Sequence, residues 1–329
     1  MNRRQRLEAA LARKPADRVP VAAWGHFFDR ESTAEGLADA MVGFAETYDW
    51  DFIKIHARAS YHVEGWGFSY EPSRDPAKPH VCTGHPIASP GDWRKIRPLP
   101  LTAPALAEQF EAIRLIRARA PADMPLLMTV FSPLDIAEKL IDRDAALLKR
   151  HIEADPEALE VALAAFAETF AAFVGALPAL GVDGLFFSTK WANDSKLGAA
   201  LYDRLVRPYD LAVLAEAKGL WCRMLHLCED RVQLSALADY PVDILHWDAY
   251  AGHNPGYGAG AAASGRIVAG GVDAATLANG TPDAVRWRAM ACLNDTGRQG
   301  FILGPGCSVQ IARTPPANLH ALRAAANAG

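Results

Sequence analysis

Eight short runs of apolar, β-branched and aromatic residues recur along the chain, and longer stretches with helical patterning separate them. Most of the runs are continuously apolar, which is typical of parallel strands covered by helices on both faces. They span residues 18–24, 52–56, 126–131, 182–187, 221–227, 242–247, 266–269 and 300–303. Eight strands that alternate with helices predict the α/β class and, within it, a (β/α)8 TIM barrel.

Capping residues mark the starts of three of the helices. The stretch Ser32-Thr33-Ala34-Glu35 matches a capping box ahead of a helix that runs to Tyr48. Asp155-Pro156-Glu157 places a cap and then a proline before the alanine-rich stretch 158–177. Thr281-Pro282-Asp283 repeats the same device before a helix near the C-terminus. These starts fall between the expected strands, as a barrel requires.

Two connections depart from the regular pattern. About 70 residues separate the second strand from the third, where short connections are the rule. This insertion holds an aromatic, glycine- and proline-rich part (61–100) and a helix near 106–119. Between the sixth and seventh strands, the glycine-rich segment 252–260 stands in place of a well-formed helix. No internal repeat or linker divides the chain, so we expect a single domain over residues 1–329.

Composition excludes several classes of protein. The 329 residues fit two domains or one large barrel, and 34 basic against 38 acidic residues give a net charge of -4. Half of the residues are apolar, so the chain is not disordered, and its charge does not favour nucleic-acid binding. The basic N-terminus leads into no apolar signal core, and the apolar, charge-free stretch 169–182 contains a proline and is too short to span a membrane. We therefore expect a cytoplasmic protein with no membrane and no nucleic-acid partner.

Three potential metal ligands fall at the expected mouth of the barrel, where active sites of this fold lie. His226 and Cys228 are two residues apart at the end of the fifth strand, so both side chains can point to the same face. Cys307 comes just after the last strand. One imidazole and two thiolates suit zinc, and three protein ligands leave a fourth position open for catalysis. The alternative interpretation is two buried cysteines and a satisfied histidine.

The other three cysteines carry less chemical information. An odd number of cysteines scattered over a chain of this size does not indicate a disulfide framework, and a reducing compartment is expected. Cys222 begins the fifth strand and should lie at the opposite end of the barrel, while Cys292 falls on a predicted helix. Both are expected to be core residues. Cys82, in the insertion, is either exposed or packed.

Asp248 follows the sixth strand and is the candidate catalytic carboxylate. Three roles are open to it: a displaceable fourth metal ligand, a substrate contact, or a cap on the following turn. His246 shares the same face of the strand and is either a support for the metal ligands or a packed histidine.

Basic residues at the end of the second strand form the candidate substrate-binding set. Lys54, His56 and Arg58 alternate on one face and suit a carboxylate or phosphate group. The alternative is an ion-pair network with nearby acidic residues. Aromatic residues of the insertion either cover a flat ligand or pack the insertion on the barrel, and they are Tyr61, Trp66 and Trp93, with His62 beside them.

Motifs throughout the chain resemble the uroporphyrinogen decarboxylase superfamily, whose fold is a (β/α)8 barrel. The resemblance extends over essentially the whole sequence and is strongest near the C-terminus. It rests on Asp17-Arg18-Val19-Pro20-Val21, Gly181-Val182-Asp183-Gly184, Leu225-His226-Leu227-Cys228, Gly270-Gly271-Val272-Asp273, Leu303-Gly304-Pro305-Gly306-Cys307 and Thr314-Pro315-Pro316-Ala317-Asn318-Leu319.

The family contains two chemistries, and the sequence resembles one more than the other. Uroporphyrinogen decarboxylases carry an arginine-bearing segment that binds the tetrapyrrole carboxylates, whereas residues 22–30 here lack the paired arginines. Corrinoid methyltransferases of the methylcobalamin:coenzyme M type carry a His-X-Cys…Cys zinc motif. His226, Cys228 and Cys307 match that motif, and Cys307 stands where the decarboxylases carry a histidine.

The resemblance therefore implies a zinc-dependent methyltransferase. Its methyl carrier would be a corrinoid such as methylcobalamin, free or bound to a carrier protein. The small-molecule thiol partner would be coenzyme M, homocysteine or a related acceptor. The alternatives are decarboxylation of a tetrapyrrole and non-catalytic binding of a corrinoid or tetrapyrrole.

Overall fold

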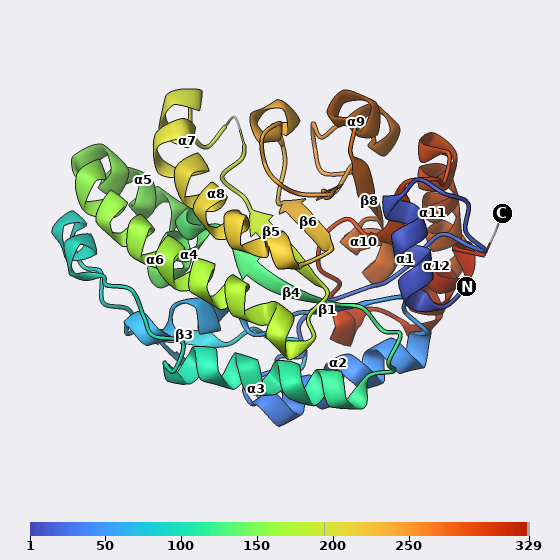
Figure 1. Cartoon of the computed structure of the whole chain (residues 1–329), viewed down its shortest axis with the longest axis horizontal. Coiled ribbons are helices and arrows are strands. Elements are labelled where there is room, and N and C mark those ends of the chain that lie inside the picture. Colours follow the sequence, from blue (N-terminus) through green and yellow to red (C-terminus); the bar gives the residue numbers. More distant parts are fainter. Residues whose placement is uncertain (194, 328–329) are drawn as a thin grey trace.

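Seven of the eight expected strands form one curled parallel sheet in the computed structural model, which describes residues 1–193 and 195–327. Their order in the sheet follows their order along the chain, as βα repeats require. The strands are β1 (Ile53–Ile55), β4 (Leu126–Phe131), β5 (Gly184–Thr189), β6 (Cys222–Leu227), β7 (Ile244–His246), β8 (Ile267–Val272) and β9 (Phe301–Pro305). Figure 1 shows the sheet surrounded by helices.

The segment 18–24, expected as the first strand, pairs only briefly. Val21 forms an isolated parallel bridge with Leu303 of β9, and on the other side its carbonyl accepts a hydrogen bond from the Asp51 amide at 2.8 Å. Pro20 has no N–H to donate, which limits any longer ladder here. The prediction of the α/β class is confirmed. A closed eight-stranded barrel is not confirmed, because the sheet is a seven-stranded half-barrel.

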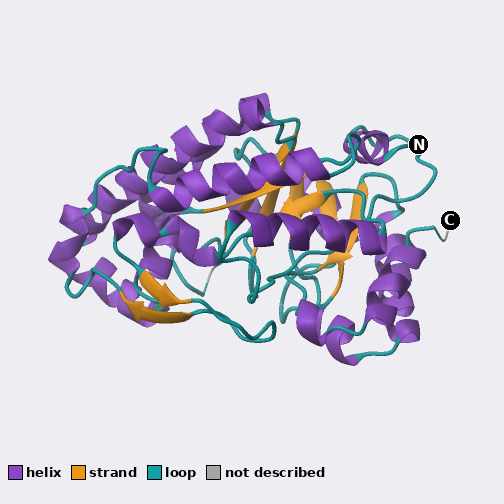
Figure 2. Cartoon of the chain, turned by 90° about the horizontal axis from the view of Figure 1, so that it is seen from below, coloured by secondary structure: helices purple, strands orange, loops and turns teal. Residues whose placement is uncertain are grey.

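Helices cover the outside of the sheet, and Figure 2 shows the strands among them. The α-helices are α1 (Arg3–Leu11), α2 (Ala34–Tyr48), α3 (Pro104–Arg119), α4 (Pro133–Leu140), α5 (Ala145–Ala154), α6 (Pro156–Ala176), α7 (Ala199–Leu205), α8 (Arg207–Ala215), α9 (Tyr257–Ser264), α10 (Ala274–Asn279), α11 (Pro282–Thr296) and α12 (Pro316–Ala325). The 3-10 helices are η1 (Ala59–His62), η2 (Glu64–Trp66), η3 (Pro90–Lys95), η4 (Leu177–Leu180), η5 (Glu216–Gly219), η6 (Leu234–Leu237) and η7 (Ile311–Arg313).

The expected helix starts are present, with one difference in detail. The Asp155 side chain accepts from the Ala158 amide at the start of α6, and Thr281 caps α11 in the same way. At α2 the cap is Thr33, which accepts from the Gly36 amide. The cap therefore lies one residue later than the Ser32-to-Glu35 capping box requires.

The long connection between β1 and β4 contains an antiparallel hairpin, β2 (Ser69–Glu71) with β3 (Val81–Gly84), together with α3. Its aromatic side chains are used for packing. Trp93 is fully buried and donates to His151, while the Tyr61 hydroxyl donates to the Thr129 carbonyl at 2.6 Å. The packing alternative therefore describes these two residues.

The glycine-rich segment 252–260 was expected to replace a helix, and this expectation is wrong for its second half. Helix α9 begins at Tyr257 and includes Gly260. A Cβ atom at Gly260 would lie 2.4 Å from the Trp247 ring, so glycine lets this helix approach the aromatic side chain. The short, small-residue helix was hidden by its glycine content, which lowers helix propensity.

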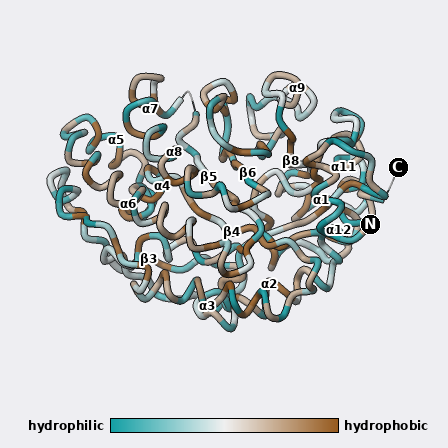
Figure 3. Tube along the Cα trace, viewed as in Figure 1, coloured by the Kyte–Doolittle hydropathy of each residue, from teal (hydrophilic) through white to brown (hydrophobic). Residues whose placement is uncertain are grey.

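The core is one continuous cluster of buried apolar residues. Figure 3 shows hydrophobic residues along the strands and more hydrophilic residues in the outer loops. One helical stretch, Pro156–Leu180, is long and apolar enough to cross a membrane by length and composition alone. It is weak support for a membrane span, because more than half of its most apolar window is buried, as in the core helix of a soluble protein.

Candidate functional site

His226, Cys228 and Cys307 meet at the carboxyl ends of β6 and β9. Their potential ligand atoms all lie within 4.8 Å of one another, and the Cys307 Sγ is 3.6 Å from the His226 Nε2. His226 is buried and both thiols are partly buried. Parallel pairing along β6, β7, β8 and β9 brings the carboxyl ends of these strands to one edge. The predicted juxtaposition of these three residues is therefore present.

A second histidine determines which nitrogen of His226 is free. The Nε2 of His246 is 2.9 Å from the Pro305 carbonyl, so it must carry a proton and donate it. Burial lowers the pKa of His246 to about 3, so the ring is neutral and its Nδ1 can only accept. That Nδ1 lies 2.7 Å from the His226 Nδ1, which must therefore donate. The His226 Nε2 lone pair is left facing Cys307.

The two cysteines share a proton unequally. A hydrogen bond from the Cys228 thiol holds the pKa of Cys307 well below its usual value, against the opposing effect of burial. The same sharing, together with burial, raises the pKa of Cys228. The pair therefore holds one thiolate readily at neutral pH, and a cation at the site favours a second.

This donor set fits a zinc ion. One imidazole nitrogen and two sulfur atoms are the ligand types that zinc takes, and the second histidine supports the ligating one as in many zinc sites. The spacing of the three donor atoms permits one ion to contact all of them. All three candidate ligands, His226, Cys228 and Cys307, also line a cavity, so a fourth position is open to a small molecule.

The cavity beside these ligands has a volume of about 350 Å³. Lys54 and His56 lie on its wall, with the Lys54 Nζ 2.7 Å from the His56 Nδ1 and 4.2 Å from the centre of the Phe186 ring. Burial lowers the pKa of Lys54 to about 7, although the two cysteine thiolates oppose this shift. Burial and Lys54 keep the pKa of His56 well below its usual value.

Arg58, the third member of the expected basic set, lies away from this cavity. The chain leaves β1 after Ile55, so strand alternation no longer governs residue 58. Its guanidinium is buried and forms ion pairs with Glu64 at 2.7 Å and with Glu108. The ion-pair alternative therefore describes Arg58, whereas Lys54 and His56 remain candidates for substrate binding.

Asp248 is not among the residues that line the cavity beside His226, Cys228 and Cys307. Its Oδ1 accepts from the Tyr250 amide at 2.9 Å, which is the turn-capping role. Its carboxyl group packs against Gly306, where an added Cβ would come within 2.5 Å of the Asp248 Cγ. Within the described residues, Asp248 does not join the three-residue group whose donor atoms meet. Burial, which outweighs the Tyr250 hydrogen bond, raises the pKa of its carboxyl group.

Sequence reasoning missed a charged wall of the cavity that α4 supplies. Asp135 and Lys139 face the cavity from this helix, and Lys190 joins them from the end of β5. Lys190 pairs with the buried Glu138, while burial raises the pKa of Asp135 to about 7. The available signal is the clustering of three charged residues in the first helix after a buried strand.

The remaining cysteines lie outside the metal-ligand group. Cys222 and Cys292 are buried, and burial raises the pKa of both thiols. Cys82 is half-buried on the hairpin, and its Sγ is 3.8 Å from the Gly84 carbonyl.

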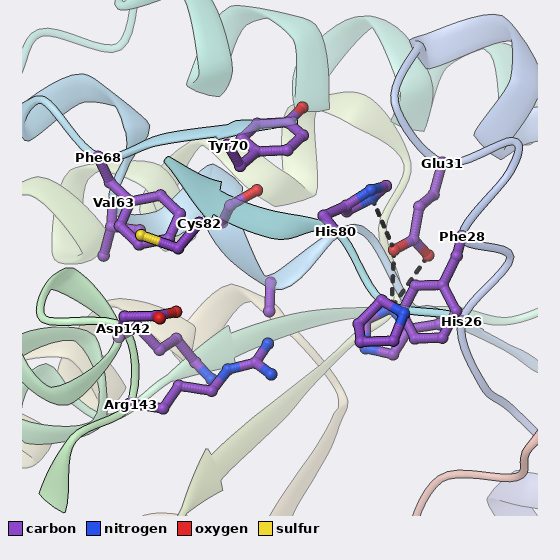
Figure 4. Close-up of a pocket in the computed structure, with 14 residues that line it drawn as sticks. His26, Phe28, Glu31, Val63, Phe68, Tyr70, His80, Cys82, Asp142 and Arg143 are labelled. Atoms are coloured by element: carbon purple, nitrogen blue, oxygen red, sulfur yellow. Dashed lines mark hydrogen bonds and ion pairs between the residues drawn. The ribbon is translucent and has the colours of Figure 1, made fainter. Parts of the chain in front are cut away.

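A second, smaller cavity of about 60 Å³ lies between the hairpin and the end of α4 (Figure 4). Glu31 is buried in its wall between two histidines, 2.9 Å from the His26 Nδ1 and 3.4 Å from the His80 Nε2. Burial opposes the charge of Glu31, but the two histidines outweigh it and lower the pKa of this carboxyl group to about 2. Glu31 therefore stays ionised and ties the hairpin to the loop after the first expected strand.

Comparisons with known proteins agree with this architecture. The sequence profile of the protein family "Uroporphyrinogen decarboxylase (URO-D)" matches residues 2–328. No curated protein matches the sequence.

Solved structures with similar folds include one methyltransferase and two methionine synthases. A "methyltransferase from Methanosarcina mazei" superimposes with a TM-score of 0.84 at 20% identity, covering 100% of this chain and 99% of the other. A B12-independent methionine synthase from Shewanella sp. W3-18-1 gives a TM-score of 0.59 at 15% identity, covering 94% and 97%. A putative vitamin-B12 independent methionine synthase from Listeria monocytogenes gives 0.54 at 11%, covering 89% and 84%. At these identities the likeness shows the fold alone.

Proposed function

Because the chain belongs to the uroporphyrinogen decarboxylase family, whose members catalyse more than one type of reaction, we propose one specific reaction for this protein. The protein is a zinc-dependent methyltransferase that moves a methyl group between a corrinoid, such as methylcobalamin, and a small thiol. Coenzyme M and homocysteine are candidate thiols. We place the protein in the cytoplasm, where thiol ligands stay reduced, and a corrinoid carrier protein is its expected partner.

The observation that carries this proposal is the meeting of His226, Cys228 and Cys307 beside a cavity. A decarboxylase has no need of two thiols and an oriented imidazole at one point. The arrangement is also more than a chance cluster, because His246 selects the tautomer of His226 that a metal ligand needs.

The residues around the cavity have separate roles in the proposed reaction. Bound zinc would supply a Lewis acid that lowers the pKa of an acceptor thiol. His226, through Nε2, and the sulfur atoms of Cys228 and Cys307 would hold the ion. Lys54 lines the same cavity and, with a pKa of about 7, can take up or release a proton at Nζ near neutral pH. Phe186 and Trp24 line the same cavity and supply an apolar surface beside the reacting groups.

Metal analysis combined with a methyl-transfer assay tests the proposal. Purified protein should contain nearly one zinc ion per chain and should demethylate methylcobalamin when thiols are added, with a change in absorbance. Cys228→Ser and Cys307→Ser should lose the zinc. Cys222→Ala is the matched control, because Cys222 lies on the same strand but outside the ligand group, and it should retain zinc.

Two outcomes would overturn the proposal. One is a protein that neither binds added zinc nor demethylates methylcobalamin. The other is release of carbon dioxide from a porphyrinogen without zinc, which would select the decarboxylase alternative.

A further inference from the structure

We propose that Lys139 and Arg143 form an anion-binding subsite that fixes an acidic group of the substrate at the junction of the two cavities. This inference rests on the proposed function and assigns the two side chains that bind the acidic group of its thiol substrate, a carboxylate, sulfonate or phosphate. The two residues act in specificity and take no part in the chemistry at the metal ligands.

The position of the two residues identifies the junction. The cavity beside the metal ligands and the smaller cavity under the hairpin share four lining residues, and Lys139 and Arg143 are the two cations among them besides His26. Lys139 lies in the last turn of α4, and Arg143 follows four residues later. Both side chains line the same cavity as Cys228 and Cys307, so a ligand that occupies this cavity has the two thiols and the two cations on its walls.

Three of the acidic groups around the junction are engaged or only partly ionised, whereas a fourth, the Asp142 carboxylate, lines the smaller cavity. Glu138 pairs with Lys190 and accepts from the Trp191 indole, and Glu31 is held by two histidines. Burial raises the pKa of Asp135 to about 7, so this carboxyl group is only partly ionised at neutral pH. Within the described part of the chain, neither Lys139 nor Arg143 has an ion-pair partner.

The positive charges of Lys139 and Arg143 repel one another, and the nearby Asp135 and Glu138 offset the charge of Lys139 only in part. Burial and the nearby Arg143 lower the pKa of Lys139 to about 8, and its Nζ lies 3.9 Å from the centre of the Phe131 ring. An anion placed between the two cations removes this repulsion and gains charge-assisted hydrogen bonds from both. The guanidinium is suited to a planar or tetrahedral oxyanion.

The backbone after α4 is held in an uncommon conformation that places Arg143. Asp142 and Arg143 both have positive φ angles, 55° and 65°, which residues with a Cβ adopt at an energetic cost. Figure 4 shows the Arg143 guanidinium reaching toward the middle of the smaller cavity, while the Asp142 carboxylate lies at one end. Such strain in two consecutive residues is typical of functional positions.

Calorimetric titration of the zinc-loaded protein with three matched thiols tests the subsite. The probes are 3-mercaptopropionate, 3-mercaptopropane-1-sulfonate and the neutral 3-mercapto-1-propanol. We expect at least one anionic thiol to bind about tenfold more tightly than the alcohol, which corresponds to one charge-assisted hydrogen bond. Lys139→Gln and Arg143→Gln should each lose most of this preference without weakening the alcohol, and Arg143→Lys should retain part of it.

Arg150→Gln is the matched control. It removes one positive charge from the exposed face of α5, outside both cavities, and should keep the full preference. Equal binding of all three thiols by the wild-type protein, or an undiminished preference in both glutamine variants, would overturn the subsite.

A second measurement separates this inference from the proposed function. Propionate, propane-1-sulfonate and inorganic phosphate lack a thiol, so their binding does not depend on zinc. If the protein binds no zinc, the subsite still predicts that at least one of these anions binds the wild-type chain more tightly than the Lys139→Gln/Arg143→Gln double variant. Equal binding to both proteins refutes it, while failure of the zinc site alone refutes only the methyltransferase.

Discussion

His246 and His226 face one another through their Nδ1 atoms at 2.7 Å, with the proton on His226. The proton is there because the Pro305 carbonyl, 2.9 Å away, takes the only N–H of His246. Pro305 lies two residues before Cys307, so the end of β9 both supplies one ligand and orients another. The ends of β6, β7 and β9 therefore fix the tautomer and orientation of the His226 imidazole without a bound metal.

Replacing His246 should weaken zinc binding without removing a ligand. His246→Phe keeps an aromatic ring against Trp24 and Phe186 but cannot accept the His226 proton, so His226 is free to turn or change tautomer. Loss of such a supporting partner lowers metal affinity by about 10- to 100-fold. Competition with a chromophoric chelator measures the affinity.

His246→Asn tests the same mechanism from the other side. Its amide oxygen occupies roughly the position of Nδ1 and can still accept from His226, so part of the affinity should return. If the phenylalanine variant binds zinc as tightly as the wild type, His246 has only a packing role.

The strands were predicted most accurately where their runs of apolar residues were longest and most continuous. Strands β4 and β6 lie within a residue of their expected bounds, because buried parallel strands are continuously apolar. The meeting of His226, Cys228 and Cys307 was predicted because strand alternation and family resemblance pointed to the same three residues. The segment 18–24 is as apolar as the other predicted strands, but Pro20 restricts its pairing. Whether the sheet closes into a barrel depends on the strands on either side of this segment, which its own sequence does not show.

Features that depend on the spatial meeting of distant residues were not predictable. The partners of Arg58 lie in η2 and α3, and no local pattern connects them. Similarly, the role of His246 depends on one backbone carbonyl of β9. Residues of α4 reach the cavity because this helix packs beside it after β4. The periodicity of the sequence predicts a helix but not where that helix packs.

Arg58 should matter for stability and not for the metal site. Its side chain is 2% exposed between Glu64 and Glu108, which are 19% and 29% exposed. Arg58→Met leaves two half-buried carboxylates without their cation, and we expect a loss of about 2 kcal/mol in the free energy of unfolding, below the range for fully buried charges. Urea unfolding measures this loss.

Two comparisons make the Arg58 result specific. Arg94→Met breaks an exposed ion pair with Asp155 and should cost less than about 1 kcal/mol. Zinc content of folded Arg58→Met should equal that of the wild type. If Arg58→Met is as stable as the wild type but binds the thiol more weakly, Arg58 is a substrate-binding residue.

Asp210 predicts a pH dependence of stability that is independent of the metal site. Its carboxyl group is fully buried in α8, accepts from the Tyr240 hydroxyl at 2.8 Å, and has its pKa raised to about 7 by burial. The folded chain therefore holds a proton that the unfolded chain releases near pH 4. This stabilisation is complete below pH 4 and disappears as the pH rises through 7.

Asp210→Asn mimics the protonated group and should abolish that part of the pH dependence. The difference in unfolding free energy between the variant and the wild type should change by up to about 4 kcal/mol from pH 4 to pH 8, in favour of the variant. Denaturant unfolding at several pH values measures it. Asp203→Asn, an exposed position, is the control, and parallel curves for Asp210→Asn and the wild type would contradict the burial argument.

Asp248 distinguishes a turn cap from a metal ligand. Asp248→Asn keeps an oxygen that accepts from the Tyr250 amide, so we expect unchanged stability and full zinc content. Asp248→Ala removes the acceptor and should cost about 1 kcal/mol while zinc is retained. Metal analysis and urea unfolding of both variants check this. Loss of zinc from the folded asparagine variant would instead make Asp248 the fourth ligand, because an amide oxygen is a far weaker zinc ligand than a carboxylate.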